Sequence, residues 1–269
     1  MDRSRFEPPS AFFLLFDQLA ALELGAFVAL APVLSFGNSG KGLPVLVLPP
    51  FGASDWSTAP MRGVLRQKGY ATYGWKLGSN IGPHPHIVEG IDRRLRELYQ
   101  RHQTGITVIG WSLGGVYARE LARINPQAVR QVITLGSPYH FRPGDRSSVS
   151  PLYDAIAPRL DAFLPQKEPE SSRPPLPVPA TSIYTRTDGM VPWHACVDAV
   201  GPTSENVEVR GSHSGLGFNV AALVAISDRL AQAEGIWAPF CPPPALRCLF
   251  PTPAARRPTG RSSAVASAT

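Results

Sequence analysis

Short apolar runs alternate with longer amphipathic segments over most of this chain. Apolar runs bounded by Gly or Pro are typical of strands buried on both faces, and apolar residues recurring every three or four positions are typical of helices packed on such strands. The predicted strands are residues 43–48, 70–75, 106–110, 130–135, 180–185 and 205–210. The predicted helices are residues 57–68, 87–99, 116–123 and 218–231. The alternation predicts an α/β fold whose sheet of about six strands is mainly parallel and flanked by helices.

Two segments interrupt this alternation. Residues 140–179 contain a helical candidate at 152–164 and then a proline-rich run, and we expect a small cap here, with a plain surface excursion as the alternative. Residues 239–269 are rich in proline and without periodicity, so we expect a disordered tail. The predicted organisation is an N-terminal helical segment (1–36), an α/β domain (37–238) and this tail.

The N-terminal segment is strongly apolar. Between residues 10 and 34 only Asp17, Gln18 and Glu23 interrupt a run long enough for a membrane span, and the two acids make a span costly. Pro32 directly after Ala31 spoils a signal-peptide cleavage site. We favour a helix with both acids on its wet face, lying on the domain or on a membrane surface and docking lipid or a second copy. A membrane anchor and a cleaved or uncleaved signal peptide are the alternatives.

Length and charge narrow the function classes. The 269 residues suit one large α/β domain, and the net charge is +6. Four arginines of the tail carry much of that charge, so about +2 remains elsewhere, which gives little reason to expect a nucleic-acid partner. The three cysteines have no metal-type spacing and fit a reducing compartment. The expected location is cytoplasmic, with membrane association through residues 10–34 left open.

The strongest chemical signal is Gly110-x-Ser112-x-Gly114. The pattern alone is weak, but here a β-branched strand precedes it, and a helix-forming segment follows it and stops at Asn125-Pro126. That context predicts a sharp strand-to-helix turn that exposes the serine hydroxyl above the sheet, a nucleophile elbow.

A serine nucleophile needs a base and a group that orients the base. Asp188 directly follows the predicted strand 180–185, although an ordinary Asp-Gly turn is the simpler alternative. Asp154 and Asp198 are weaker rivals because neither abuts a strand end. His213 follows the last strand among small residues, so we expect it to be the base.

The other histidines lie in loops or on a polar helix face, and His140 and His194 keep a weak claim to a substrate contact.

The remaining expected parts are oxyanion donors and substrate contacts. The backbone N–H groups of Leu113 and Phe51 are the candidate donors, because Phe51 is the first residue after Pro49-Pro50 with an N–H to give. Apolar side chains close to these motifs suggest an apolar acyl group and are the candidate substrate contacts: Trp56, Trp111, Met190 and Trp193.

The order Ser112, Asp188, His213 resembles that of the α/β-hydrolase superfamily, and within it the chain is most similar to bacterial lipase/esterase-like serine hydrolases. The resemblance spans roughly residues 43–233 and is carried by residues 46–51, 110–115, 135–138, 188–192 and 211–213. It implies the α/β-hydrolase fold and a Ser-His-Asp triad. Two departures are Pro50, where the family usually has glycine, and the absence of strands before Leu43.

Three hypotheses of function follow. The favoured one is a serine hydrolase that cleaves a small-molecule or lipid-like carboxylic ester, with no cofactor and no metal. An acyltransferase would use the same triad and acyl-enzyme with a different acceptor. A non-catalytic binding protein on a hydrolase scaffold is the third, because fold does not imply function.

Overall fold

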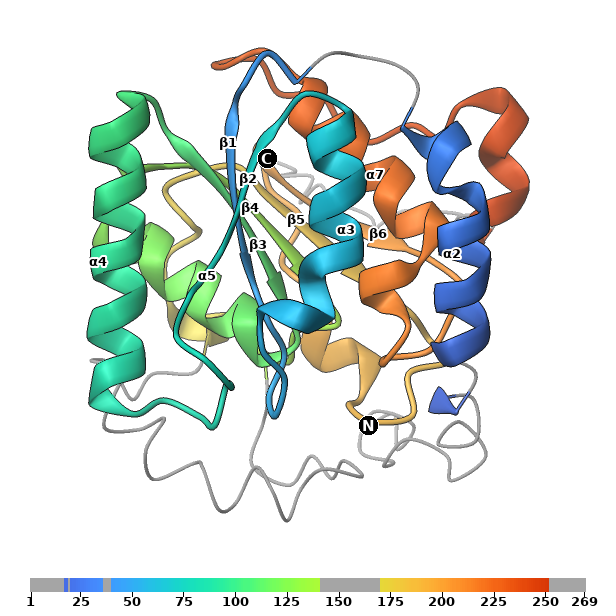
Figure 1. The fold of residues 1–269 in the computed structure, drawn as a ribbon, viewed down its shortest axis with the longest axis horizontal. Helices are drawn as coiled ribbons and strands as arrows, with labels where there is room; N and C mark the ends of the chain where they lie inside the picture. The colour runs from blue at the N-terminus through green and yellow to red at the C-terminus, as the bar shows by residue number, and fades with distance from the viewer. Residues whose placement is uncertain (1–16, 19, 36–39, 141–169, 252–269) are drawn as a thin grey trace, which may run out of the picture.

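The protein folds around one fully parallel, six-stranded sheet (Figure 1). The structure is a computed structural model that describes residues 17–18, 20–35, 40–140 and 170–251. The strand order is β2-β1-β3-β4-β5-β6. The strands are β1 (Pro44–Leu48), β2 (Ala71–Gly74), β3 (Ile106–Trp111), β4 (Val129–Leu135), β5 (Ala180–Tyr184) and β6 (Ser204–Glu208).

Helices cover both faces of the sheet (Figure 1). One face carries α4 (Pro85–His102) and α5 (Leu113–Ile124). The other carries α2 (Ala20–Leu34), α3 (Asp55–Gln67) and α7 (Val220–Ala231). Short 3-10 helices η2 (Glu170–Ser172), η3 (Trp193–Cys196), η4 (Leu216–Phe218) and η5 (Pro244–Leu249) lie in the connections and near the C-terminus.

The strand side chains alternate between two apolar cores. In β1, Val45 and Val47 belong to the core under α2, α3 and α7, whereas Leu46 and Leu48 belong to the core under α4 and α5. Both faces are therefore apolar, which explains why the central strands read as continuous apolar runs in the sequence.

The strand order places a topological switch beside β1. From β1 the chain runs outward to β2 and then returns to β3 on the other side of β1. In open parallel sheets the connections diverge at such a point and leave a crevice beyond the carboxyl ends of the strands. The loop after β1 and the turn after β3, which carries Ser112, meet at this edge.

The predicted fold class and N-terminal helix are confirmed. Each strand lies within two residues of its predicted bounds. The largest helical difference is α4, which spans Pro85–His102 where residues 87–99 were predicted. The α5 helix begins at Leu113 and includes Gly114 and Gly115. A helix that begins just after Ser112 was expected, and Gly114 and Gly115 lie in its first turn, close to Leu48 and Ser137.

In the N-terminal segment, the two carboxylates point in a different direction from the one predicted. Asp17 and Glu23 were expected on a wet face, but their carboxylates accept hydrogen bonds from the loop around His213. Within the described ranges, no helix is both long and apolar enough to cross a bilayer.

The proline-rich tail was predicted to lack structure from residue 239 onward, and this is wrong for its first part. Residues 244–249 form η5, and Phe250 is 7% exposed with its ring centroid 5.1 Å from that of Phe240. Two phenylalanines packing onto the apolar core hold the segment despite its prolines. Residues 252–269, most of the predicted cap and the helical candidate at 152–164 lie outside the described residues.

Candidate active site

Ser112 occupies the turn between β3 and α5 in a backbone conformation that side chains rarely adopt. Its φ is 51° and its ψ is −120°, and its N–H donates to the carbonyl of Leu135 on β4 at 2.8 Å. A non-glycine residue held there stores strain of about 1–3 kcal/mol, which the surrounding packing must offset. The turn lifts the hydroxyl out of the sheet while the chain enters α5.

The glycines around Ser112 allow this turn because nothing larger fits. A Cβ on Gly110 would lie 2.3 Å from the carbonyl oxygen of Gly114. A Cβ on Gly114 would lie 2.5 Å from the carbonyl oxygen of Leu48, at the end of β1. A Cβ on Gly115 would lie 2.0 Å from Ser137 Oγ. The three glycines are therefore required by the close packing of α5 on β1, β3 and β4.

Three side chains from separate loops meet at the carboxyl edge of the sheet. His213 Nε2 lies 3.1 Å from Ser112 Oγ, and His213 Nδ1 lies 2.6 Å from Asp188 Oδ2. Because a carboxylate can only accept, the Nδ1 nitrogen carries the proton and Nε2 is left to accept the proton of the serine hydroxyl. His213 and Asp188 are 4% and 3% exposed.

Asp188 is fixed by its own loop. Its Oδ1 accepts the N–H groups of Met190 and Val191 at 2.9 and 2.8 Å, which leaves Oδ2 for the imidazole. These two hydrogen bonds orient the Asp188 carboxylate towards the histidine.

Burial and nearby charge act on His213 in opposite directions. Burial lowers its pKa, but the Asp188 carboxylate, through its charge and its hydrogen bond, and the charge of Asp17 outweigh burial. The net result is a pKa raised above the ordinary value of 6.5. This environment favours the imidazolium that forms when histidine takes a proton from serine.

The two predicted oxyanion donors lie on adjacent elements. Leu113 is the first residue of α5, so its N–H has no acceptor within the helix. Phe51 lies in the loop after β1, and the packing of Gly114 against Leu48 and Pro49 brings that loop next to the start of α5.

Asn80 holds the loop that carries Phe51, and sequence reasoning missed it. Its side chain is fully buried and donates from Nδ2 to the carbonyl of Pro49 at 2.9 Å. Its Oδ1 accepts from Tyr117 Oη at 3.3 Å, and its backbone exchanges hydrogen bonds with Gly52 and Ala53. An isolated loop asparagine carries no sequence signal for this role.

The predicted substrate contacts have different surroundings. Trp111 is buried and donates from Nε1 to the carbonyl of His213 at 3.2 Å, so it helps to hold the loop that carries the histidine. Trp193 stacks on Tyr184 with the Arg186 guanidinium over its ring. Met190 is half-buried and its sulfur accepts from Ser214 Oγ. Trp56 is 84% exposed on the first turn of α3.

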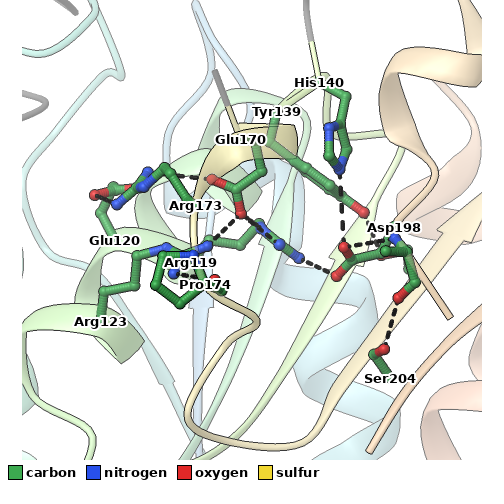
Figure 2. A network of polar contacts seen from close by, with 12 residues as sticks. Arg119, Glu120, Arg123, Tyr139, His140, Glu170, Arg173, Pro174, Asp198 and Ser204 are labelled. Carbon is green, nitrogen blue, oxygen red and sulfur yellow. Dashed lines mark hydrogen bonds and ion pairs between the residues drawn. The ribbon is translucent and has the colours of Figure 1, made fainter. Parts of the chain in front are cut away.

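The weaker candidates from the sequence belong to a buried ion network (Figure 2). Asp198 accepts from Arg119 at 2.7 Å and lies 3.8 Å from His140 Nε2. Arg119 also pairs with Glu170 at 2.5 Å. This network joins α5, η2 and the loop before β6, and it does not include Ser112, Asp188 or His213. Asp154 lies outside the described residues, and His194 precedes Cys196 in η3.

Among the side chains that the structure describes, no group of three or more His, Cys, Asp and Glu residues is arranged to hold a metal ion.

Several solved structures share this fold. The mature lipase BlEst2 of Bacillus licheniformis is 14% identical, with a TM-score of 0.53 over 72% of this chain and 94% of that one. Aspergillus fumigatus lipase B is 16% identical, with a TM-score of 0.55 over 74% of this chain and 55% of that one. A pyrethroid hydrolase from Sphingobium faniae is 15% identical, with a TM-score of 0.51 over 70% and 97%. The protein thus has the α/β-hydrolase fold of these structures.

Residues 78–172 match the family model described as the PGAP1-like alpha/beta domain. The match includes β3, the Ser112 turn and α5 but covers less than half of the chain. A comparison with curated proteins finds no match.

Proposed function

We propose that this protein is a serine hydrolase that cleaves carboxylic esters. The observation that carries the proposal is the contact series from Asp188 Oδ2 through the His213 imidazole to Ser112 Oγ, at 2.6 and 3.1 Å. A serine hydroxyl is a poor nucleophile at neutral pH, and an imidazole within hydrogen-bond reach removes this limitation.

The proposed reaction has two halves. Ser112 Oγ attacks the ester carbonyl while His213 Nε2 takes the hydroxyl proton, and Asp188 holds the resulting imidazolium. His213 then gives the proton to the leaving alcohol, and an acyl group remains on Ser112. In the second half His213 takes a proton from water, the resulting hydroxide attacks the acyl carbonyl, and Ser112 regains its proton as the acid leaves.

The oxyanion of each tetrahedral intermediate is assigned to the N–H groups of Leu113 and Phe51. Support comes from the position of Leu113 at the N-terminus of α5, where the helix dipole is positive. Removing one such donor typically costs about 10²–10³-fold in rate.

An apolar acyl group is the substrate feature we favour. Phe51 packs against the apolar core at the loop after β1, and Met190 packs beside Tyr184, Val191 and Cys196 next to Asp188. These side chains give the edges of the site an apolar character. Lipases among the proteins of similar fold agree with this preference.

The direct test measures hydrolysis of p-nitrophenyl esters from acetate to palmitate. We expect the wild type to hydrolyse esters of longer acyl chains faster than the acetate. Ser112→Ala should lower the rate of hydrolysis at least about 10⁴-fold, because only binding and the oxyanion donors remain. Ser204→Ala is the matched control, since Ser204 begins β6 at the opposite edge of the sheet. Equal turnover by Ser112→Ala and the wild type would refute the assignment.

A further inference from the structure

The N-terminal segment reaches the candidate active site through two carboxylates. Glu23 of α2 accepts the N–H of Ser212 at 2.9 Å, and Asp17, just before α2, accepts the N–H of Ser214 at 2.8 Å. These are the residues on either side of His213. With Trp111 Nε1 bonded to the carbonyl of His213, three side chains hold three backbone groups of residues 212–214.

Close packing shows that Glu23 fits this loop tightly. A Cβ added to Gly215 would lie 1.6 Å from Glu23 Oε2. Gly215 has φ −97° and ψ −15°, which any residue adopts, so its backbone does not require glycine. The small residue at 215 is instead needed because the Glu23 carboxylate lies over it, with Ser212 Oγ also close.

Burying either carboxylate in this apolar segment costs folding free energy. Glu23 is the only charged residue of α2, and burial raises its pKa most strongly, with the N–H of Ser212 opposing that effect. One oxygen of each carboxylate is buried without a hydrogen-bond partner among the described residues. Buried carboxylates that are only half satisfied destabilise a fold, so their presence beside His213 calls for a compensating role.

We propose that Asp17 and Glu23 are positioning residues that fix loop 212–214, so that His213 Nε2 faces the Ser112 hydroxyl while Nδ1 meets Asp188. This inference rests on the proposed function. In this view the N-terminal segment is part of the active-site architecture. Asp17 has a second effect, because its negative charge favours the imidazolium form of His213.

Paired substitutions separate the hydrogen bond from the charge. Asp17→Ala or Glu23→Ala removes both, whereas Asp17→Asn and Glu23→Gln keep an oxygen that can accept the same N–H. We expect kcat per active site, counted by fluorophosphonate labelling, to fall about 10–100-fold in each alanine variant with KM within about twofold. The amide variants should recover most of that loss.

The pH profile supplies a readout that a merely structural role would not move. The charged and polar groups that act on the His213 imidazole are Asp188, Asp17 and the Ser112 hydroxyl, and Glu23 of α2 accepts the backbone N–H of the neighbouring Ser212. Without the Asp17 charge the pKa of His213 falls, so the acid limb of kcat/KM in Asp17→Asn should move to lower pH. NMR titration of the His213 ring should show the same shift without any substrate.

A substitution from the other side gives an independent check. Gly215→Ala pushes a methyl group into the Glu23 carboxylate, so it should lower kcat in the wild type. In the Glu23→Ala background the same change should cost much less, because the carboxylate it meets is gone. Gln18→Ala, at an exposed position of the same segment, is the matched control and should leave kcat unchanged.

The outcomes are separable from those of the proposed function. If the wild type neither turns over esters nor labels at Ser112, the proposed function fails and this inference fails with it. If the wild type is active, but the alanine variants keep its kcat per active site, or the amide variants are no better than alanine, only the positioning role is refuted.

Discussion

Ser112 combines the candidate chemistry with a strained backbone. Its φ of 51° is maintained by packing of α5 against β1 and β4, and it is the feature that turns the hydroxyl away from the sheet. At this scale the sequence was informative, because the glycines, the serine and the order of acid and histidine follow from local motifs. It could not reveal Asp17, Glu23 or Asn80, since each acts through a contact 31 or more residues away.

The strain leads to a stability prediction. Ser112→Gly removes the side chain that disfavours this conformation, whereas Ser112→Ala keeps a Cβ there. We expect the glycine variant to be more stable than the alanine variant by about 1 kcal/mol, with both inactive. Urea denaturation of the two variants measures the difference, and an alanine variant of equal or greater stability would show that the turn is not strained.

Asp188 gives a prediction of pH dependence. Its carboxylate raises the pKa of His213, and the base must be neutral to accept a proton, so wild-type kcat/KM should fall on the acid side with a pKa above 6.5. Asp188→Asn removes the charge and the tautomer control, so kcat/KM should drop about 10⁴-fold and the acid limb should move to lower pH. An unchanged acid limb in this variant would contradict the role of Asp188.

At the scale of elements, α5 is braced at both ends. Its first turn is locked against β1 and β3 by glycines, and further along Arg119, Glu120 and Arg123 enter the ion network with Glu170 and Arg173 (Figure 2). Amphipathic spacing predicted the helix itself. The network could not be predicted, because its partners are separated by 47 to 79 residues and were assigned to other segments.

This network makes acid stability depend on Asp198. Burial alone would raise its pKa, but His140 and Arg119 outweigh burial and lower the pKa to about 2 from 3.8. The stability gained from this ionised carboxyl is therefore present above pH 4 and lost as pH falls through about 2, and it amounts to about 2 kcal/mol.

The check compares Asp198→Asn with the wild type. Asp198→Asn should be destabilised in urea at pH 7, with the difference from wild type shrinking between pH 4 and pH 2. A difference that stays constant over this range would mean that the charge of Asp198 is not what stabilises the network.

At the scale of the whole molecule, the mainly parallel sheet and its flanking helices follow from periodicity, because each element is amphipathic or continuously apolar in the way its position requires. The strand order does not follow from periodicity and comes from the structure. The α2 helix is the exception. It is apolar on all sides, and its outward residues Leu22 and Val33 are 70% and 67% exposed, with Val28 and Leu30 beside them. Periodicity cannot orient such a helix, which explains why Glu23, and Asp17 just before the helix, were assigned to the wrong face.

The exposed apolar side of α2 keeps the predicted membrane contact open to test, and we expect it to bind a lipid surface. Phosphatidylcholine vesicles should co-sediment with the wild type. Val28→Asp combined with Val33→Asp should weaken this binding at least about tenfold, because two apolar side chains that would enter the lipid are lost. Ile124→Asp, which alters an exposed apolar residue of α5, is the control. Binding unaffected by the α2 changes would refute a lipid role, and a dimer disrupted by them would assign the surface to a second copy.

The central claim is that Ser112 is a nucleophile activated by His213 and Asp188. Reaction with a fluorophosphonate, followed by intact-mass and peptide mass spectrometry, tests it without knowledge of the natural ester. The account predicts one adduct on the wild type, located at Ser112, absent from Ser112→Ala and formed much more slowly in His213→Ala. A folded wild type without an adduct, or with its adduct at another residue, would contradict it.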